Sequence, residues 1–217
     1  MSSKPALITA KTNAHTAKIL AANDPLLEKL FREQGIPPLW NREPGFATLV
    51  HIILEQQVSL ASGKAAFTRL TEVIDPFTPE TFLTLSDSSL KIIGFSRQKS
   101  AYCHFLAQGI LSGSISLEEI AVMDDAEAYQ ELVKIKGVGP WTAHIYLLMG
   151  LSRADIWPSG DLALMNALQV LTARPKKLTL KQAELMAEHW RPYRSVAARM
   201  LWQYYLSNPQ AFKGSKI

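Results

Sequence analysis

Residues 135–143 read IKGVGPWTA, and this stretch interrupts a region that is apolar at helical spacing on both sides. Gly137 and Gly139 predict the end of a first helix, because glycine permits positive φ or a close approach of the backbone. Pro140 suits the first turn of a second helix, where its missing N–H costs nothing. The stretch therefore predicts a helix, a tight hairpin and a second helix.

The start of the second helix carries bare backbone amides, which predict a site for an anion and most readily for a phosphate. The charge distribution is compatible with that partner. Residues 131–217 hold 12 Lys and Arg against 5 Asp and Glu, whereas residues 1–130 hold 11 against 14. A nucleic-acid-binding face requires such an excess, but an ordinary charge fluctuation explains it equally well. Charge alone does not decide between the two.

Composition excludes several classes of protein. The chain has 217 residues, 47% hydrophobic and 19% charged, which is typical of one globular domain or two small subdomains. Cys103 is the single cysteine, so we expect no disulfide, no zinc site and no Fe–S cluster. We find no signal peptide and no membrane-spanning run, and therefore expect no membrane partner. The expected location is the cytoplasm, at the nucleoid in a bacterium, or the nucleus in a eukaryote.

Helical patterns follow one another along the chain, separated by short turns. Asp24 is placed to cap a helix that begins at Pro25, and Ser116 with Glu119 predicts a capping box. No convincing pair of alternating strands is present. The pattern predicts an all-α fold of about ten helices. The clearest helical segments are 23–31, 45–57, 62–74, 78–85, 86–94, 97–111, 161–171, 179–190 and 192–206.

Asp161 lies in the stretch ADIWPSGDLALMNAL, residues 154–168, where it precedes an apolar helix. Its ordinary interpretation is a helix N-cap. However, Trp141 stands 20 residues earlier, at the head of the helix that follows the hairpin. If the chain doubles back between them, the carboxylate faces a cleft beside the phosphate-binding element. A carboxylate and an aromatic surface near DNA indicate a base held outside the duplex.

The chain resembles the helix-hairpin-helix (HhH-GPD) DNA glycosylases in the spaced aspartate and in three segments: LVKIKGVGPWTAHIYLL, HIILEQQVSLASGKAA and WRPYRSVAARMLW. It is most similar to the bacterial 3-methyladenine glycosylase II type, in a compact form without the N-terminal β domain. The resemblance covers roughly residues 20 to 206. The hairpin alone is a weak signal, because polymerases and ligases also grip DNA with one. A hairpin with an aspartate at this spacing is specific.

The resemblance implies a single catalytic domain over residues 1–217, with two helical subdomains flanking a cleft. One is a helical barrel of about 42–137, and the other combines about 1–41 with 138–217. The implied activity is that of a monofunctional, monomeric DNA glycosylase in base excision repair. Its implied partner is double-stranded DNA containing alkylated bases, from which it flips out and hydrolyses 3-methyladenine and 7-methylguanine.

The resemblance also assigns roles to individual residues. Asp161 becomes the catalytic aspartate, and Trp141 and Trp202 line the base pocket. Ile145 stands where the larger bacterial enzyme has a tyrosine, so part of that aromatic lining is absent. The implied DNA contacts are Gly137, Val138, Gly139, Gln57, Ser59, Arg97 and Lys99, with Gln57 as the wedge that fills the gap left by the flipped base. The carbonyls of Val133, Ile135 and Gly137 hold a structural Na⁺ or K⁺ ion, and no cofactor is required.

The chemistry fits these residue types independently of the family. An N-glycosidic bond breaks through a sugar with oxocarbenium character, which a fixed carboxylate stabilises. The carboxylate can also orient or deprotonate the attacking water. Alkylated purines are cationic and leave easily, and indole faces attract such a base.

Each assignment has a plainer alternative. Trp202 lies at core-like helical spacing, and Trp141 is also explained as a packing residue of the hairpin. Gln57 is also explained as a helix-end amide, and Arg97 and Lys99 as part of a solvated turn. Arg194 and Ser195 are expected to orient the last helices.

Two other functions stay open at this point. A bifunctional glycosylase/lyase needs a lysine nucleophile, which the family places just before the TA of the hairpin, where this chain has Trp141. A non-catalytic DNA-binding module would need the hairpin, but neither Asp161 nor two pocket tryptophans.

Overall fold

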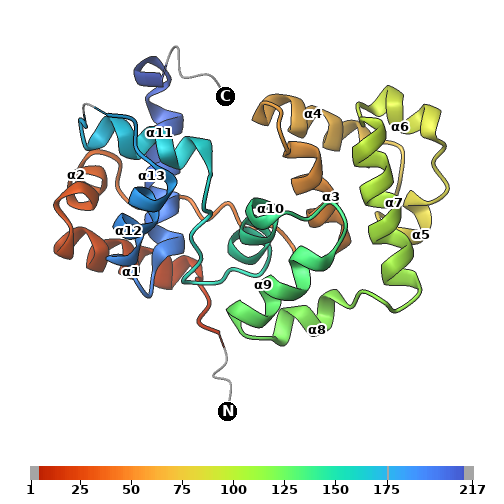
Figure 1. The fold of residues 1–217 in the computed structure, drawn as a ribbon, viewed down its shortest axis with the longest axis horizontal. Coiled ribbons are helices and arrows are strands. Elements are labelled where there is room, and N and C mark those ends of the chain that lie inside the picture. Colours follow the sequence, from red (N-terminus) through yellow and green to blue (C-terminus); the bar gives the residue numbers. More distant parts are fainter. Residues whose placement is uncertain (1–4, 175, 213–217) are drawn as a thin grey trace. The chain divides into compact units, whose positions relative to one another are not determined.

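The computed structural model describes residues 5–174 and 176–212, which form helices joined by short turns (Figure 1). The chain divides into two compact units. We call Arg42–Tyr146 the middle unit. Pro5–Asn41, together with the described residues from Leu147 onward, is the terminal unit.

The middle unit is built around α3 (Phe46–Glu55), whose side chains are buried on almost every side. This helix packs against α4, α7 and α10, so its apolar sequence FATLVHIILE needs no polar face. The hydroxyl of Tyr146 accepts the N–H of Gly45 at the start of α3 (3.0 Å), and burial raises the pKa of Tyr146 to about 12. The other helices are α4 (Leu60–Thr71), α5 (Pro79–Phe82), α6 (Asp87–Ile93), α7 (Arg97–Leu111), α8 (Leu117–Val122), α9 (Asp125–Lys134) and α10 (Pro140–Ile145).

The terminal unit is built around α13 (Arg194–Ser207), in which every residue from Ser195 to Trp202 is buried. It packs against α1, α2, α11 and α12, so segments from the two ends of the sequence share one core (Figure 1). The surrounding elements are α1 (Ala10–Asn23), α2 (Pro25–Gln34), a π-helical turn at Tyr146–Gly150, α11 (Leu162–Leu171), α12 (Leu180–Glu188) and a 3₁₀ turn at Pro209–Phe212.

The boundary between the units differs from the expected one. It falls after Tyr146, whereas the sequence interpretation places α10 with the later residues by dividing the chain at 137. The reason is packing, because α10 contacts α9 and α3 of the middle unit. Helix α1 is a second difference. It has a capping box formed by Thr9 and Thr12, but its weak amphipathic pattern gave no helix in the sequence interpretation.

The predicted all-α class is confirmed for the described residues. Their β structure is limited to one antiparallel bridge between Leu7 and Arg153. This bridge belongs to the terminal unit, where Ile8 N–H donates to the carbonyl of Ser152 (2.7 Å). Among the residues placed by the structure, no helix is long and apolar enough to cross a membrane.

Candidate active site

A tethered loop leads to Asp161 in the terminal unit. Ser195 at the start of α13 accepts the N–H of Ile156 at its Oγ (3.0 Å). Arg194 donates from Nε to Asp155 Oδ1 (2.8 Å), in the same loop. The expected orienting role of Arg194 and Ser195 thus extends to this loop. Gly160 then turns the chain with φ of 78°, a value that glycine adopts without a steric penalty.

Asp161 is the N-cap of α11, as its position in the sequence predicts. Its Oδ1 accepts the N–H of Leu164 at 2.9 Å, which satisfies one of the unpaired amides of the first helical turn. The same oxygen accepts the indole N–H of Trp202 at 3.0 Å. Only 9% of the residue is exposed. The carboxylate is therefore held in one orientation by two donors, which is the arrangement that a preorganised charge requires.

Trp202 lies on the buried face of α13, and 7% of it is exposed. Core-like spacing predicted this burial. The family resemblance predicts a place in the base pocket, and the structure puts the indole N–H against Asp161. Its ring also meets Trp40 edge to face, with centroids 6.5 Å apart and planes inclined at 71°. Trp40 was missed at the sequence level, because it stands in a Pro-rich connection without helical periodicity.

The hairpin of the middle unit joins α9 to α10 through residues 135–139. Gly137 adopts φ of 90°, and a Cβ there would clash with the ring of Tyr102. Gly139 has φ of −86°, and a Cβ built there meets no atom within 4 Å. Conformation and packing therefore explain the glycine at 137 but not the one at 139.

The turn after α3 is fastened to this hairpin within the middle unit. Gln56 donates from Nε2 to the carbonyl of Gly137 (2.9 Å) and to Oγ1 of Thr142 (2.8 Å). The next residue, Gln57, is exposed and has φ of 54°, which is uncommon for a residue other than glycine. The predicted wedge residue, Gln57, thus has a strained backbone and directly follows Gln56, which is fixed to the hairpin.

Lys99 has a structural task in the same region. Its Nζ donates to the carbonyls of Leu54 (2.7 Å) and Gln56 (2.8 Å), at the C-terminal end of α3. Burial lowers the pKa of Lys99. Two of its three N–H donors are therefore used within the protein. The sequence predicted neither the contacts of Lys99 nor those of Gln56, because in each case the bonded residues are far apart in the chain.

The remaining residues of the expected DNA contacts have varied surroundings. Ser59 caps α4 by accepting the N–H of Ser62 (3.2 Å), and Arg97 is exposed at the start of α7. Val138 is 4% exposed and donates its N–H to the carbonyl of Ile135 (2.9 Å). In α10, Ile145 is 2% exposed and Trp141 is half-buried.

The expected cation ligands in the hairpin already accept hydrogen bonds at two positions. The carbonyl of Ile135 accepts from Val138, and that of Gly137 accepts from Gln56. A carbonyl oxygen has two lone pairs, so each of these carbonyls keeps one for a further partner. Among the described residues, His, Cys, Asp and Glu side chains form no group of three arranged as metal ligands.

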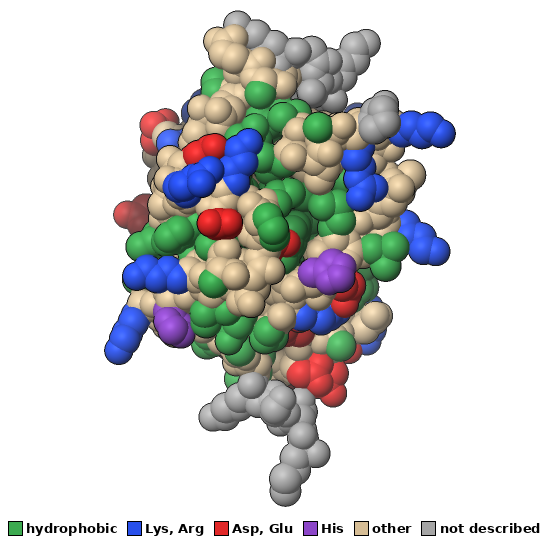
Figure 2. All heavy atoms as spheres, turned by 90° about the vertical axis from the view of Figure 1, so that its left-hand side faces the viewer, with side chains coloured by type: hydrophobic (Ala, Val, Ile, Leu, Met, Phe, Trp, Pro, Cys, Tyr) green, Lys and Arg blue, Asp and Glu red, His purple; other side chains and the backbone are tan. Residues whose placement is uncertain are grey.

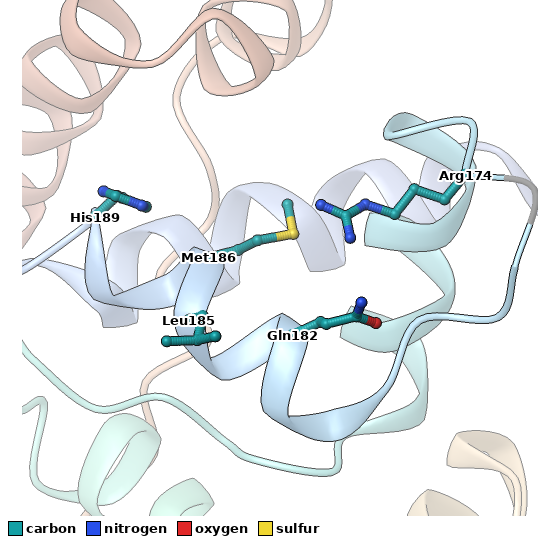
Figure 3. A pocket seen from close by; sticks show the side chains of 5 residues that line it. All are labelled: Arg174, Gln182, Leu185, Met186 and His189. Carbon is teal, nitrogen blue, oxygen red and sulfur yellow. The ribbon is translucent and has the colours of Figure 1, made fainter.

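A shallow hollow of about 170 Å³ lies on the terminal unit, between Arg174 and the α12 side chains. Figure 3 shows the guanidinium of Arg174 extending toward Met186 across this hollow. Four of the five residues that line the hollow belong to α12 or its C-cap, and Asp161 is not among the five. The hollow is therefore not part of the aspartate site.

On the face shown in Figure 2, Lys and Arg side chains stand in several separate places, some beside acidic side chains, and not in a single patch. Part of the basic excess is neutralised in ion pairs. Arg191 and Arg194 both contact Asp155, at 2.6 and 2.8 Å, and both contact Glu188. Part of the positive charge in residues 131–217 is thus used in ion pairs within the protein.

These features define an all-α protein with a helix-hairpin-helix element and a preorganised carboxylate at a helix N-terminus. The family model described as "HhH-GPD superfamily base excision DNA repair protein" matches residues 50–192. The chain belongs to this family, as the sequence resemblance predicted.

Individual relatives are consistent with this family assignment. DNA-3-methyladenine glycosylase 1 of Schizosaccharomyces pombe is 30% identical over 75% of this chain and 72% of its own length. The YfjP protein of Bacillus subtilis is 29% identical over 82% of this chain, which spans 64% of that relative's length. The fold is similar to a solved structure of the S. pombe 3-methyladenine DNA glycosylase in complex with abasic DNA. That match has a TM-score of 0.81 and 26% identity, and it covers 87% of this chain and 95% of the other.

Proposed function

We propose that this chain is a monofunctional DNA glycosylase that hydrolyses the N-glycosidic bond of alkylated purines in double-stranded DNA. The observation that carries the proposal is the carboxylate of Asp161, held by Leu164 and Trp202 in a chain of the HhH-GPD family. The name of the S. pombe relative supports the same activity. Its solved complex contains abasic DNA, which is the product of base removal.

The proposed reaction breaks the bond between C1′ and the base nitrogen. The bonding electrons leave with the base, so a cationic 3-methyladenine nucleotide releases a neutral base without an acid on that side. Asp161 stabilises the positive charge that develops on the sugar. Water then adds to C1′ and gives up a proton, and the same carboxylate is suited to orient this water or accept its proton.

Aromatic side chains account for substrate choice in this proposal. The indoles of Trp141 and Trp202 stack on the flipped base, and the buried Ile145 supplies neither a ring nor a hydrogen-bond donor. A cationic base gains up to about 2 kcal/mol from an indole face in a desolvated site. We therefore expect release of 3-methyladenine, slower release of 7-methylguanine, and little action on uracil or 8-oxoguanine.

The DNA grip is proposed to come from the middle unit. Gly139 has no internal reason to be glycine, so its open backbone serves close approach of a phosphate. Gln57 fills the gap left by the flipped base, and Ser59, Arg97 and the turn at Val138 lie along the bound strands. Lys99 acts indirectly, by fixing the carbonyls of Leu54 and Gln56 beside the wedge.

A Na⁺ or K⁺ ion held by the carbonyls of Val133, Ile135 and Gly137 is part of the proposal. Bound there, it would add positive charge close to the phosphate. The test is duplex affinity at constant ionic strength with KCl replaced by choline chloride. Weaker binding in choline is the expected result, and equal binding would remove the ion from the proposal.

The activity itself is tested with an alkylated duplex incubated with the protein. Free methylated base with an intact strand is the expected outcome. Base release with strand cleavage would indicate a lyase, and binding without release would indicate a DNA-binding module. A panel of single-lesion duplexes under single-turnover conditions tests substrate choice, and faster excision of uracil or 8-oxoguanine than of 3-methyladenine would contradict the account of the pocket. We further propose that the protein acts as a monomer. Its proposed location is the compartment that contains the DNA, which is the nucleoid in a bacterium or the nucleus in a eukaryote.

A further inference from the structure

Trp40 has an unusual backbone for so large a residue. Its φ is 49°, in the left-handed region that bulky side chains avoid. Such a conformation persists only where the surroundings impose it, and it is concentrated at functional sites. The residue is half-buried, so part of it is accessible from outside.

A buried arginine imposes this conformation. Arg199 of α13 is fully buried, and burial lowers its pKa to about 10. Its Nε donates to the carbonyl of Leu39 (2.8 Å), and its Nη2 donates to Oδ1 of Asn41 (3.0 Å). Asn41 also donates from Nδ2 to the hydroxyl of Ser152 (2.8 Å). The residues on both sides of Trp40 are thus fixed by one guanidinium.

The ring held in this way belongs to the aspartate site. Arg199 and Trp202 are three positions apart on α13, so they lie on the same side of that helix. One holds the backbone around Trp40, and the other meets its ring at 6.5 Å while donating to Asp161. Asp161, Trp202 and Trp40 therefore form one continuous cluster within the terminal unit.

We propose that Trp40 is a specificity-determining residue that contacts the flipped base, and that Arg199 and Asn41 are its positioning residues. The proposal rests on the glycosylase function proposed above. Two indoles inclined at 71° form a corner. A flat base stacked on one ring is bounded at its edge by the other, and a cationic base is attracted by both. This explains why a strained and costly arrangement is retained at this point of the chain.

The decisive pair of variants is Trp40→Leu and Trp40→Phe. Leucine keeps an apolar side chain but has no aromatic face, whereas phenylalanine keeps the ring. Single-turnover excision of 3-methyladenine should fall about tenfold in Trp40→Leu, the worth of one stacked ring, and less than threefold in Trp40→Phe. Excision of hypoxanthine, a neutral base, should fall less in Trp40→Leu. Phe105→Leu is the control, because Phe105 is an exposed aromatic residue on α7 of the middle unit, outside the cluster, and its rates should equal those of the wild type.

The positioning role is tested at Asn41. Asn41→Ala removes the side-chain acceptor next to Trp40 from Arg199 and leaves its backbone acceptors. It should lower the same rate at saturating enzyme without changing affinity for an abasic duplex. Asn41→Asp restores an acceptor and should recover the rate. If all lesions slow equally in Trp40→Leu and Asn41→Ala, with a lower Tm, Trp40 is only a packing residue and the proposal is wrong. Wild-type rates in Trp40→Leu would also overturn it while leaving the glycosylase function intact. A wild-type protein that releases no base would overturn both.

Discussion

Two aspartates of the terminal unit look alike in sequence and in local structure, and they differ in what surrounds them. Asp24 caps α2, and its Oδ1 accepts the N–H groups of Leu26 and Leu27, while Oδ2 accepts the indole of Trp190 (2.8 Å). Asp161 caps α11, and one oxygen accepts both a backbone N–H and the indole of Trp202.

The tryptophans extend the difference. Trp190 is 2% exposed and packs on Trp157 with centroids 5.6 Å apart, in an ordinary core contact. Trp202 packs on a half-buried tryptophan with a strained backbone. An aspartate cap joined to an indole is therefore a structural device found at both Asp24 and Asp161. We infer that the Asp161–Trp202 pair takes part in catalysis and that the Asp24–Trp190 pair is structural. The Asp24–Trp190 pair is therefore an internal control for the other.

The largest expected difference between the two caps is in catalysis. Asn caps a helix about as well as Asp, so Asp161→Asn removes the charge and keeps the fold. Base release should fall by about 100-fold or more, while affinity for DNA is retained. Asp24→Asn should leave base release unchanged. Near wild-type turnover in Asp161→Asn would remove Asp161 from the mechanism, and equal losses in both variants would erase the distinction between the caps.

The next difference is in stability, and here we expect the larger effect at the Asp24–Trp190 pair. Trp190→Phe removes the indole donor to Oδ2 of the half-buried Asp24 and leaves a smaller ring in the core. This should lower the free energy of unfolding by about 1–3 kcal/mol. The activity of the folded enzyme should not change. Urea denaturation followed by circular dichroism gives the first quantity, and active-site titration before the kinetic assay gives the second. A specific loss of activity in Trp190→Phe would show that the two devices are not separable.

How far the sequence predicts these features depends on how local their causes are. The caps at Asp24 and Asp161 and the turn at Gly137 were predictable, because each depends on residues within a few positions. The contact of Arg199 with Leu39 spans 160 positions, and no local pattern indicates it. No local pattern indicates the contact of Lys99 with the carbonyls at the end of α3 either. From the sequence alone, this basic side chain is interpreted as a phosphate contact. Trp40 stayed unnoticed because of the same lack of a local pattern.

A smaller effect concerns the indole of Trp202 itself. Trp202→Phe keeps a ring but removes the donor to Asp161 Oδ1. The carboxylate then loses the constraint that the indole N–H provides, so single-turnover excision of 3-methyladenine should fall about tenfold, consistent with one hydrogen bond to a charged group. Trp202→Ala should cost more on cationic bases than on neutral ones, because it also removes the ring. If Trp202→Phe is fully active, the indole N–H is structural, as it is in Trp190.

The smallest expected effect repeats the comparison in the middle unit, where Gly137 and Gly139 form a second pair of similar residues. Gly137→Ala forces a left-handed alanine against Tyr102 and should destabilise the protein by about 1–3 kcal/mol. Gly139→Ala meets no atom of the protein, so the free energy of unfolding should hardly change. Its affinity for any duplex should fall about threefold, consistent with one weakened hydrogen bond. Because a phosphate contact carries no sequence information, the loss should be the same with and without a lesion, and fluorescence anisotropy at two salt concentrations measures it. A loss confined to lesion-containing DNA would mean that the hairpin reads the base, and a loss of stability would mean that Gly139, like Gly137, is needed only by the fold.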